Sequence, residues 1–323
     1  MNQTPFPRFF EQSPIILGEG AVIERLRRNT DFELDPFIVN SAFIYDPKKR
    51  SALETIYRQY LDIGLNYDLP LLLSTPTWRA GRKRIAAAGY EGTDVNGDNF
   101  RFLDALLSSY GVYAQKVFIC GLLSCQGDAY SPEQALEADV AHKFHTWQAM
   151  KLAEAGVDFL LAATLPALSE ATGLASALAD TGKPYIVSFV IRPEGTLLDG
   201  TPLKDAIAAI DATVIPRPVA YLVNCTHASI FKSAILHEVN SSSLVRERLV
   251  GLLANTAALN PEELDNSNGL VAEEPEIFGQ TVACLHGELG MKILGGCCGT
   301  DHRHIRHLAK QLTSDILKSE PVK

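Results

Sequence analysis

The most informative part of the sequence is the segment Leu294-Gly295-Gly296-Cys297-Cys298-Gly299-Thr300, near the C-terminal end of the chain. It follows the apolar run Met291–Ile293, which is typical of the end of a buried strand. Glycines permit tight turns and close backbone approach, so the two thiols are presented together where this strand ends. Adjacent cysteines form strained disulfides, whereas thiolates are preferred zinc ligands. The pair therefore indicates a metal site.

A third thiol stands in Asn224-Cys225-Thr226, directly after the apolar run Val219–Val223. Outward from these two stretches, short apolar runs alternate with longer amphipathic segments about eight times, which favours a parallel sheet with crossover helices. Eight such units predict an α/β fold, a closed (β/α)8 TIM barrel, with residues 1–323 as a single domain. The predicted strands are Pro14–Gly18, Leu69–Leu73, Lys116–Cys120, Val157–Ala162, Tyr185–Ile191, Val219–Val223, Leu249–Ala254 and Met291–Leu294.

Three segments between the strands carry predictions of their own. Pro47–Gly64 has helical spacing, with Gly64 as its stop signal. A second helix is expected from Pro132 to about Gly156. The apolar run Phe37–Asn40 is read as a strand or a loop.

The composition narrows the class of protein. The 323 residues carry a formal net charge of −9, which argues against a nucleic-acid surface. No apolar run reaches the ~18 residues expected of a membrane span. The start of the chain lacks the order of a signal peptide, and six cysteines are too few for a disulfide framework in a chain this long. We expect a cytoplasmic protein without a membrane partner, and the sequence does not decide between a monomer and a homo-oligomer.

The order of the strands predicts where the three cysteines meet. In a (β/α)8 barrel the functional residues follow the C-terminal ends of the strands, and alternate strands contribute to one layer. Cys225 follows the sixth predicted strand, and Cys297 and Cys298 follow the eighth. A zinc ion with three protein ligands keeps one position open, as in catalytic sites. Three thiolates make it a weak Lewis acid but a suitable host for one more thiol, which stays nucleophilic towards a methyl group on a sulfonium or an ammonium.

Both cysteine stretches resemble the homocysteine S-methyltransferase family, and the resemblance spans nearly the whole chain. It implies a zinc-dependent (β/α)8 barrel of the EC 2.1.1 class with Cys225, Cys297 and Cys298 as metal ligands. The implied reaction is methyl transfer to a small-molecule thiol, homocysteine, giving methionine. The implied donor is S-methylmethionine or S-adenosylmethionine, or betaine in one branch. The remaining cysteines, at 120, 125 and 284, are read as ordinary small apolar residues.

Two places near the predicted strand ends match the family less closely. Family members usually carry Asp where this chain has Glu19, before Gly20, and that acid helps to hold the substrate amine. Glu19 is therefore a predicted substrate contact, or else an acid beside a helix dipole. The family usually reads Glu-Thr-x-Pro where this chain has Ala163-Thr164-Leu165-Pro166. Loss of one charged partner should cost about 1.5–3 kcal/mol. Either the longer Glu19 side chain compensates for this loss, or the preferred acceptor is a thiol other than ordinary homocysteine.

The other candidate substrate-binding residues could instead have structural roles. Trp78 follows the second strand and could cover a cationic methyl donor, or pack at a helix start. Asn224 is expected to orient the Cys225 turn, and the loop of residues 121–131 could rim the site through Gln126, Asp128 and Tyr130. The three histidines of the last predicted helix are read as surface or packing residues: His302, His304 and His307.

Three rival functions remain open from the sequence. One is a zinc enzyme that demethylates an unusual donor with a non-amino-acid thiol as acceptor. Another is an inactive family member that binds zinc without turnover. The third is a dithiol redox protein that uses Cys297 and Cys298, against which the presence of Cys225 counts.

Overall fold

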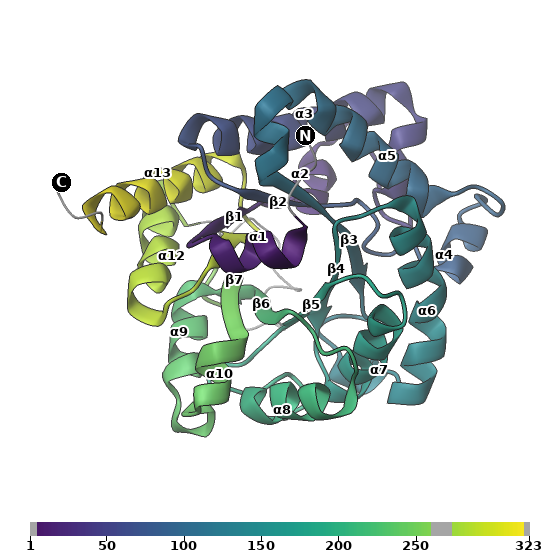
Figure 1. The fold of residues 1–323 in the computed structure, drawn as a ribbon. Coiled ribbons are helices and arrows are strands. Elements are labelled where there is room, and N and C mark those ends of the chain that lie inside the picture. Colours follow the sequence, from purple (N-terminus) through teal and green to yellow (C-terminus); the bar gives the residue numbers. More distant parts are fainter. Residues whose placement is uncertain (1–4, 260–272, 320–323) are drawn as a thin grey trace.

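The computed structural model describes residues 5–259 and 273–319, and its centre is a closed barrel of eight parallel strands in sequence order (Figure 1). The first and last strands pair in parallel, with Leu17 opposite Leu294, and this pairing closes the barrel. The predicted (β/α)8 fold is confirmed. The strands are β1 Ile16–Gly18, β2 Leu71–Ser74, β3 Val117–Ser124, β4 Phe159–Leu165, β5 Tyr185–Phe189, β6 Ala220–His227, β7 Leu249–Asn255 and β8 Ile293–Gly296.

Helices surround the barrel as an outer ring (Figure 1). This arrangement follows from the sequence, because strands buried on both faces read as continuous apolar runs. The helices are α1 Phe6–Gln12, α2 Ile23–Arg28, α3 Pro47–Tyr67, α4 Arg82–Ala87, α5 Val95–Leu107, α6 Ala138–Ala155, α7 Leu168–Ala179, α8 Leu203–Thr213, α9 Ala228–Leu236, α10 Ser243–Arg248, α12 Pro275–Leu289 and α13 His302–Ser319. Short 3-10 helices are η1 Ser41–Tyr45, η2 Ser108–Lys116, η3 Pro132–Gln134 and η4 Glu238–Asn240.

The interior of the barrel is a packed apolar layer. Its buried side chains come from most of the strands and from α1, and they include Ile16, Phe118, Leu161, Ile186, Leu222 and Ile293. A larger apolar cluster lies between the strands and the ring of helices. Burial of this much apolar surface is the main stabilising contribution to the fold. Apolar side chains therefore occupy most of the interior, and the functional residues are expected at the C-terminal ends of the strands.

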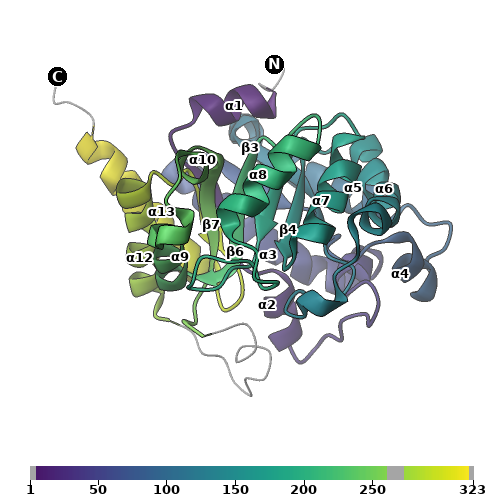
Figure 2. The same ribbon diagram turned by 90° about the horizontal axis from the view of Figure 1, so that it is seen from below.

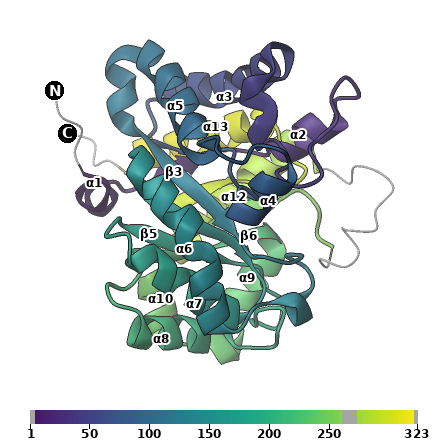
Figure 3. The same ribbon diagram turned by 90° about the vertical axis from the view of Figure 1, so that its right-hand side faces the viewer.

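Helix α1 covers the end of the barrel where the strands begin. The Phe6 ring stacks on Phe159 with their centroids 4.0 Å apart, and Phe9 lies 4.5 Å from Phe118. Figure 1 shows α1 across the centre of the barrel, and Figures 2 and 3 show it at the end opposite α2. The apolar interior therefore continues into α1, a helix that the sequence did not predict.

Helix α3 continues beyond its predicted stop at Gly64 and ends at Tyr67. A Cβ atom at Gly64 would lie 1.9 Å from the Tyr113 hydroxyl, so this glycine makes room for a neighbouring side chain. The helix ends instead at Asp68, whose φ of 52° lets its backbone N–H bond the carbonyls of Gly64 and Leu65. The prediction took a packing glycine for a terminating one.

Of the two readings of residues 37–40, the structure has the loop, and an isolated bridge joins Asp35 to Val39. One further prediction differs from the structure. The helix expected from Pro132 begins as η3, and the α-helical part starts at Ala138. The segment between them is extended because the Leu136 N–H bonds the buried Glu170 carboxylate at 3.1 Å. None of the helices within the described residues combines the length and the apolar character needed to cross a membrane.

Candidate metal and substrate site

Three sulfur atoms from two strands meet at the C-terminal end of the barrel. The Sγ atoms of Cys225, Cys297 and Cys298 all lie within 4.8 Å of one another. Sulfurs at about 2.3 Å from one tetrahedral Zn²⁺ would lie roughly 3.8 Å apart, so the separation fits a shared ion. The convergence predicted from strand order is thus present in the structure. Within the described residues, no other group of three metal-ligating side chains comes as close together.

A bulge in β6 directs Cys225 to this meeting point. The register with β7 shifts between Asn224 and Thr226, and Cys225 has a φ of 52°. A β-bulge of this kind re-aims one side chain without ending the strand. The prediction that Cys225 follows the sixth strand is therefore wrong in detail, since β6 runs on to His227. Pairing of Asn255 with His227 keeps the strand going.

The turn that carries Cys297 and Cys298 is tied to both neighbouring strands. The Cys297 N–H donates to the Ala254 carbonyl of β7 at 2.7 Å. The Gly296 N–H donates to the backbone carbonyl of Glu19, just after β1, at 2.9 Å. At Gly295, a Cβ atom would lie 2.6 Å from the Cα of Gly18. The glycines of residues 294–300 thus allow β8 to approach its neighbours closely.

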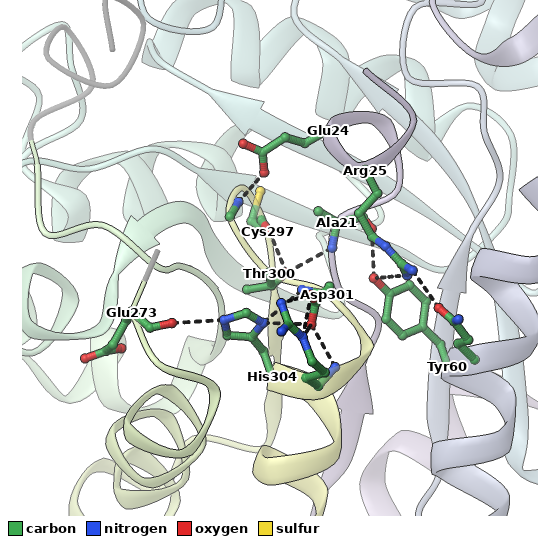
Figure 4. Close-up of polar contacts among 12 residues, drawn as sticks. Ala21, Glu24, Arg25, Tyr60, Glu273, Cys297, Thr300, Asp301 and His304 are labelled. Atoms are coloured by element: carbon green, nitrogen blue, oxygen red, sulfur yellow. Dashed lines mark hydrogen bonds and ion pairs between the residues drawn. The ribbon is translucent and has the colours of Figure 1, made fainter. Parts of the chain in front are cut away.

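Two side chains, those of Thr300 and Glu24, also hold the turn that carries Cys297 and Cys298 (Figure 4). The Thr300 hydroxyl donates to the Cys297 carbonyl at 2.7 Å and accepts from the Ala21 N–H at 3.0 Å. The Gly299 N–H donates to the Glu24 carboxylate. Sequence reasoning assigned no role to Thr300 or Glu24, although Thr300 stands in the segment 294–300 and Glu24 in the first turn of α2.

Hydrogen bonds among the sulfurs favour one thiolate. Bonds from the thiols of Cys225 and Cys298 lower the pKa of Cys297 well below its usual value. The pKa of Cys225 is raised by its hydrogen bonds with Cys297 and Cys298 and by its burial. The thiolate is the form that binds metal ions. The donor set of three soft sulfurs, one of them readily ionised, fits a zinc-type ion.

The amide of Asn224 joins three strands next to Cys225. Its Oδ1 accepts from the Thr164 N–H at 2.8 Å and from the Ser188 hydroxyl at 2.6 Å, and its Nδ2 donates to the Thr164 hydroxyl at 2.8 Å. Thr164 has a φ of 61° and lies in a second irregularity, where β4 shifts register between Ala162 and Leu165. Sequence reasoning foresaw an orienting role for Asn224 but missed Ser188.

Ala163 occupies the position of the missing family carboxylate. It is buried and packs in the apolar cluster inside the barrel. The backbone irregularity at Thr164 adjoins it, so the strand keeps an unusual conformation while the side chain is reduced to a methyl group. The Ala163 side chain therefore gives a ligand neither a charge nor a hydrogen-bonding group.

The Glu19 carboxylate lies at the C-terminal end of β1 beside a cavity of about 20 Å³ in the barrel interior. Its Oε1 accepts from the Ser74 N–H at 3.1 Å, and its Oε2 is buried without a hydrogen-bond partner. Burial raises the pKa of Glu19 to about 8. A cation placed against Oε2 would supply the missing partner and favour the ionised form.

The neighbouring candidates have packing contacts of their own. A Cβ atom at Gly20 would lie 2.7 Å from the Tyr60 hydroxyl, so this glycine allows close packing. Trp78 is partly exposed, and the Arg79 guanidinium lies 4.4 Å from the centroid of its ring. One face of this indole is therefore already covered by a cation from the chain itself.

The histidines of α13 are not grouped as metal ligands. His304 is buried at the start of the helix, where its Nδ1 bonds Asp301 at 3.0 Å and its Nε2 bonds the Glu273 carbonyl at 3.1 Å (Figure 4). This is the packing role that we expected. Of the other cysteines, Cys120 and Cys125 are buried and Cys284 is exposed, away from any cluster of metal ligands.

Comparison with known proteins agrees with this geometry. The family model described as homocysteine S-methyltransferase matches residues 16–312, which is most of the chain. The chain belongs to the homocysteine S-methyltransferase family. The resemblance inferred from the two cysteine stretches is confirmed.

Relatives within this family are distant. The chain is similar to homocysteine S-methyltransferase YbgG of Bacillus subtilis, with 28% identity over 191 residues, which cover 58% of each protein. It is similar to betaine–homocysteine S-methyltransferase 1 of Rattus norvegicus, with 24% identity over 93% of this chain and 73% of the rat protein. The match therefore spans somewhat more than half of the Bacillus protein and about three quarters of the rat protein.

The fold of this homocysteine S-methyltransferase family member is also found among solved structures. The metallated form of the Escherichia coli homocysteine methyltransferase MmuM superposes with a TM-score of 0.73 at 21% identity. The superposition covers 97% of this chain and 100% of that chain. The oxidised form of the same protein gives a TM-score of 0.72. These likenesses establish the barrel fold.

Proposed function

We propose that this chain is a zinc-dependent methyltransferase that moves a methyl group from a small sulfonium donor to a thiol, with homocysteine as the expected acceptor and methionine as product. The observation that carries the proposal is the meeting of three thiols within 4.8 Å at the catalytic end of the barrel. A zinc ion held by Cys225, Cys297 and Cys298 would bind the acceptor thiol in its open position and keep it as a nucleophilic thiolate. Family membership supports this reading.

The chain's own residues would bind and orient the acceptor. The unpartnered Oε2 of Glu19 offers a hydrogen-bond acceptor for a substrate ammonium group. Val190 and Leu198 pack beside Cys225 and bury that side chain, whereas Cys297 and Cys298 stay partly exposed. In the transfer, the acceptor sulfur forms a bond to the methyl carbon while the carbon–sulfonium bond breaks, and the donor leaves as a neutral thioether. The thiol proton is released to solvent.

Metal analysis of single-cysteine variants tests the proposal. The purified chain should contain about one zinc per protein, and Cys225→Ser, Cys297→Ser and Cys298→Ser should each lose most of it. Cys284→Ser is the matched control, because Cys284 is exposed and outside the cluster. Full zinc content in the three cluster variants, or methyl transfer without any metal, would refute the proposal.

A second candidate function is favoured by Ala163 alone. Without the second carboxylate, the site offers less binding energy to an amino-acid thiol, by about 1.5–3 kcal/mol or roughly tenfold to a hundredfold in affinity. The acceptor would then be a thiol other than homocysteine. Turnover across a panel of thiols, including homocysteine and the same thiol without its amine, decides between them. A clear preference for homocysteine would exclude this second candidate.

The proposed setting is the cytoplasm. All six cysteines are free, including the three whose sulfurs lie close together at the site. Thiols of this kind persist in a reducing compartment, where they are available to a metal. Fractionation of the producing cells, with detection of the reduced protein, would check this setting.

A further inference from the structure

Helix α3 directs two buried tyrosine hydroxyls to the C-terminal ends of β1 and β2. Tyr57 and Tyr60 are three positions apart, so they lie on the same face of the helix. The Tyr57 hydroxyl donates to the Ser74 carbonyl, at the last residue of β2, at 2.8 Å. The Tyr60 hydroxyl donates to the carbonyl of Ala21, which lies just beyond β1, at 2.7 Å. Burial raises the pKa of both tyrosines, so each hydroxyl keeps the proton that it donates.

The residues that accept these two hydrogen bonds hold Glu19 from two sides. The Ser74 N–H donates to the Glu19 Oε1 atom at 3.1 Å, so Tyr57 holds the residue that binds the carboxylate. Ala21 lies two positions after Glu19 in the chain, so Tyr60 holds the backbone from which the Glu19 side chain extends. Helix α3 therefore supports both the backbone and the carboxylate of Glu19.

The contact between Tyr60 and Ala21 has further support from both sides (Figure 4). The Arg25 guanidinium donates to the Tyr60 hydroxyl at 3.3 Å. A Cβ atom at Gly20 would lie 2.7 Å from the same hydroxyl, so a glycine here lets the tyrosine reach the backbone. The Ala21 N–H donates to the Thr300 hydroxyl at 3.0 Å. Ala21 is therefore held between α3 and the turn that follows β8.

The Glu19 carboxylate has one oxygen left for a ligand. Within the described residues its Oε2 atom is buried without a hydrogen-bond partner. Hydrogen bonds weaken steeply when distance or direction departs from the optimum. An acceptor atom that is already fixed in the right direction also avoids the entropic cost of ordering it when the ligand binds. The placement of Glu19 should therefore matter to ligand affinity as well as its charge.

We propose that Tyr57 and Tyr60 are positioning residues, which fix the Glu19 carboxylate in the direction of the amine of the acceptor thiol. The inference rests on the proposed function, in which Glu19 holds that amine. Each tyrosine gives its hydroxyl hydrogen to a backbone carbonyl of the chain, so neither needs to touch the acceptor. The effect on the substrate passes entirely through Glu19.

The experiment compares two thiols by isothermal titration calorimetry on the zinc-loaded chain. One is homocysteine and the other is γ-mercaptobutyrate, which is homocysteine without its amine. Tyr57→Phe and Tyr60→Phe remove only the hydroxyls. Tyr113→Phe is the matched control, because the Tyr113 hydroxyl also donates to a buried backbone carbonyl, that of Leu69, at 2.8 Å. Leu69 precedes β2, so this contact lies at the opposite end of the barrel.

The two variants of α3 should lose part of the preference for the amine. We expect the ratio of the two affinities to fall by about threefold to tenfold in each, a part of the full value of a charge-assisted hydrogen bond. Affinity for γ-mercaptobutyrate should stay at the wild-type value, since this thiol has no amine for Glu19 to bind. Tyr113→Phe should leave both affinities unchanged. Urea unfolding of the three variants should show similar losses of stability, because each loses one buried hydrogen bond of the same kind.

Four results would overturn the inference. The first is an affinity ratio equal to that of the wild-type chain in both variants of α3. The second is an equal loss of affinity for both thiols, which would reflect general loosening of the site. The third is a fall of the ratio in Tyr113→Phe as large as in the other two. The fourth is a wild-type chain that binds γ-mercaptobutyrate as tightly as homocysteine, because Glu19 would then hold no amine.

Failure of the proposed function would look different from all four. In that case the zinc-loaded wild-type chain would bind neither thiol. The fourth result above, by contrast, leaves methyl transfer to a thiol intact and removes only the role of Glu19 and its two tyrosines.

Discussion

The Asn224 side chain of β6 accepts a hydrogen bond from the backbone of Thr164 in β4, two strands away, with 2.8 Å between Oδ1 and the Thr164 nitrogen. Both irregular strands are joined by this contact, because Thr164 lies at the bulge of β4 and Cys225 at the bulge of β6. Positive φ angles are costly for residues other than glycine and persist only where surrounding contacts enforce them. The amide therefore keeps Cys225 aimed at its two partners.

Asn224→Ala should lower the free energy of unfolding by roughly 2–4 kcal/mol, since it leaves two buried donors without an acceptor. Ser188→Ala removes one of these donors together with its need for a partner, so its loss should be smaller. Denaturant unfolding at equilibrium measures both. An Asn224→Ala variant as stable as the wild-type chain would show that the contact does not hold the two bulges.

Thr300→Val should weaken both the turn and the metal site. It removes the acceptor for the Ala21 N–H and the donor to the Cys297 carbonyl, at a cost of about 1–3 kcal/mol in stability and about tenfold in metal affinity. Thr300→Ser should retain most of both. Thr281→Val serves as control, because the exposed Thr281 hydroxyl donates to a carbonyl within α12. Equal effects of the Val and Ser changes at residue 300 would contradict the prediction.

Glu19→Gln should change how stability depends on pH. Burial raises the pKa of Glu19 to about 8, so between pH 5 and 8 the folded state holds a proton that the unfolded state has lost. Stability of the wild-type chain should therefore fall as pH rises through this range, by at most about 1.4 kcal/mol per pH unit relative to Glu19→Gln. Urea unfolding at several pH values measures the difference. Parallel pH profiles would show that Glu19 ionises normally.

Ala163→Glu should restore preference for an amino-acid thiol. The added carboxylate would face the substrate amine, so affinity for homocysteine should rise roughly tenfold to a hundredfold over the same thiol without its amine. Ala163→Gln is the matched control, with the same length and no charge. Kinetics with both thiols give the ratio. If the Gln variant gains as much as the Glu variant, charge at this position does not select the acceptor.

Strand order and the meeting of the three cysteines were predictable because both depend on patterns that are local in sequence. Apolar runs define the strands, and parallel order places Cys225 and Cys297 at one end of the barrel. The bulge at Cys225 was not predictable, because it arises from pairing between β6 and β7. Gly64 was misread for the same reason, since its role depends on Tyr113 from a distant segment.

The hydrogen bond from Thr300 to the Cys297 carbonyl could not be predicted from the sequence for a different reason. A threonine near two cysteines carries no signal of its own, and its role follows only from the fold, in which the Ala21 N–H of the segment after β1 lies 3.0 Å from the Thr300 hydroxyl. The same holds for Glu170, whose carboxylate meets two loop nitrogens from other segments. Contacts between residues far apart in sequence, rather than residue types, decide these roles.

Helix α1 stands outside the region that the family model matches, which begins at residue 16. Its Phe6 ring nevertheless lies on Phe159, inside the same apolar layer as the strands. A shortened chain made to the family boundary would admit water to the floor of the barrel and expose aromatic surface prone to self-association. Engineered fusions at this end should therefore leave the helix intact and attach ahead of it through a spacer.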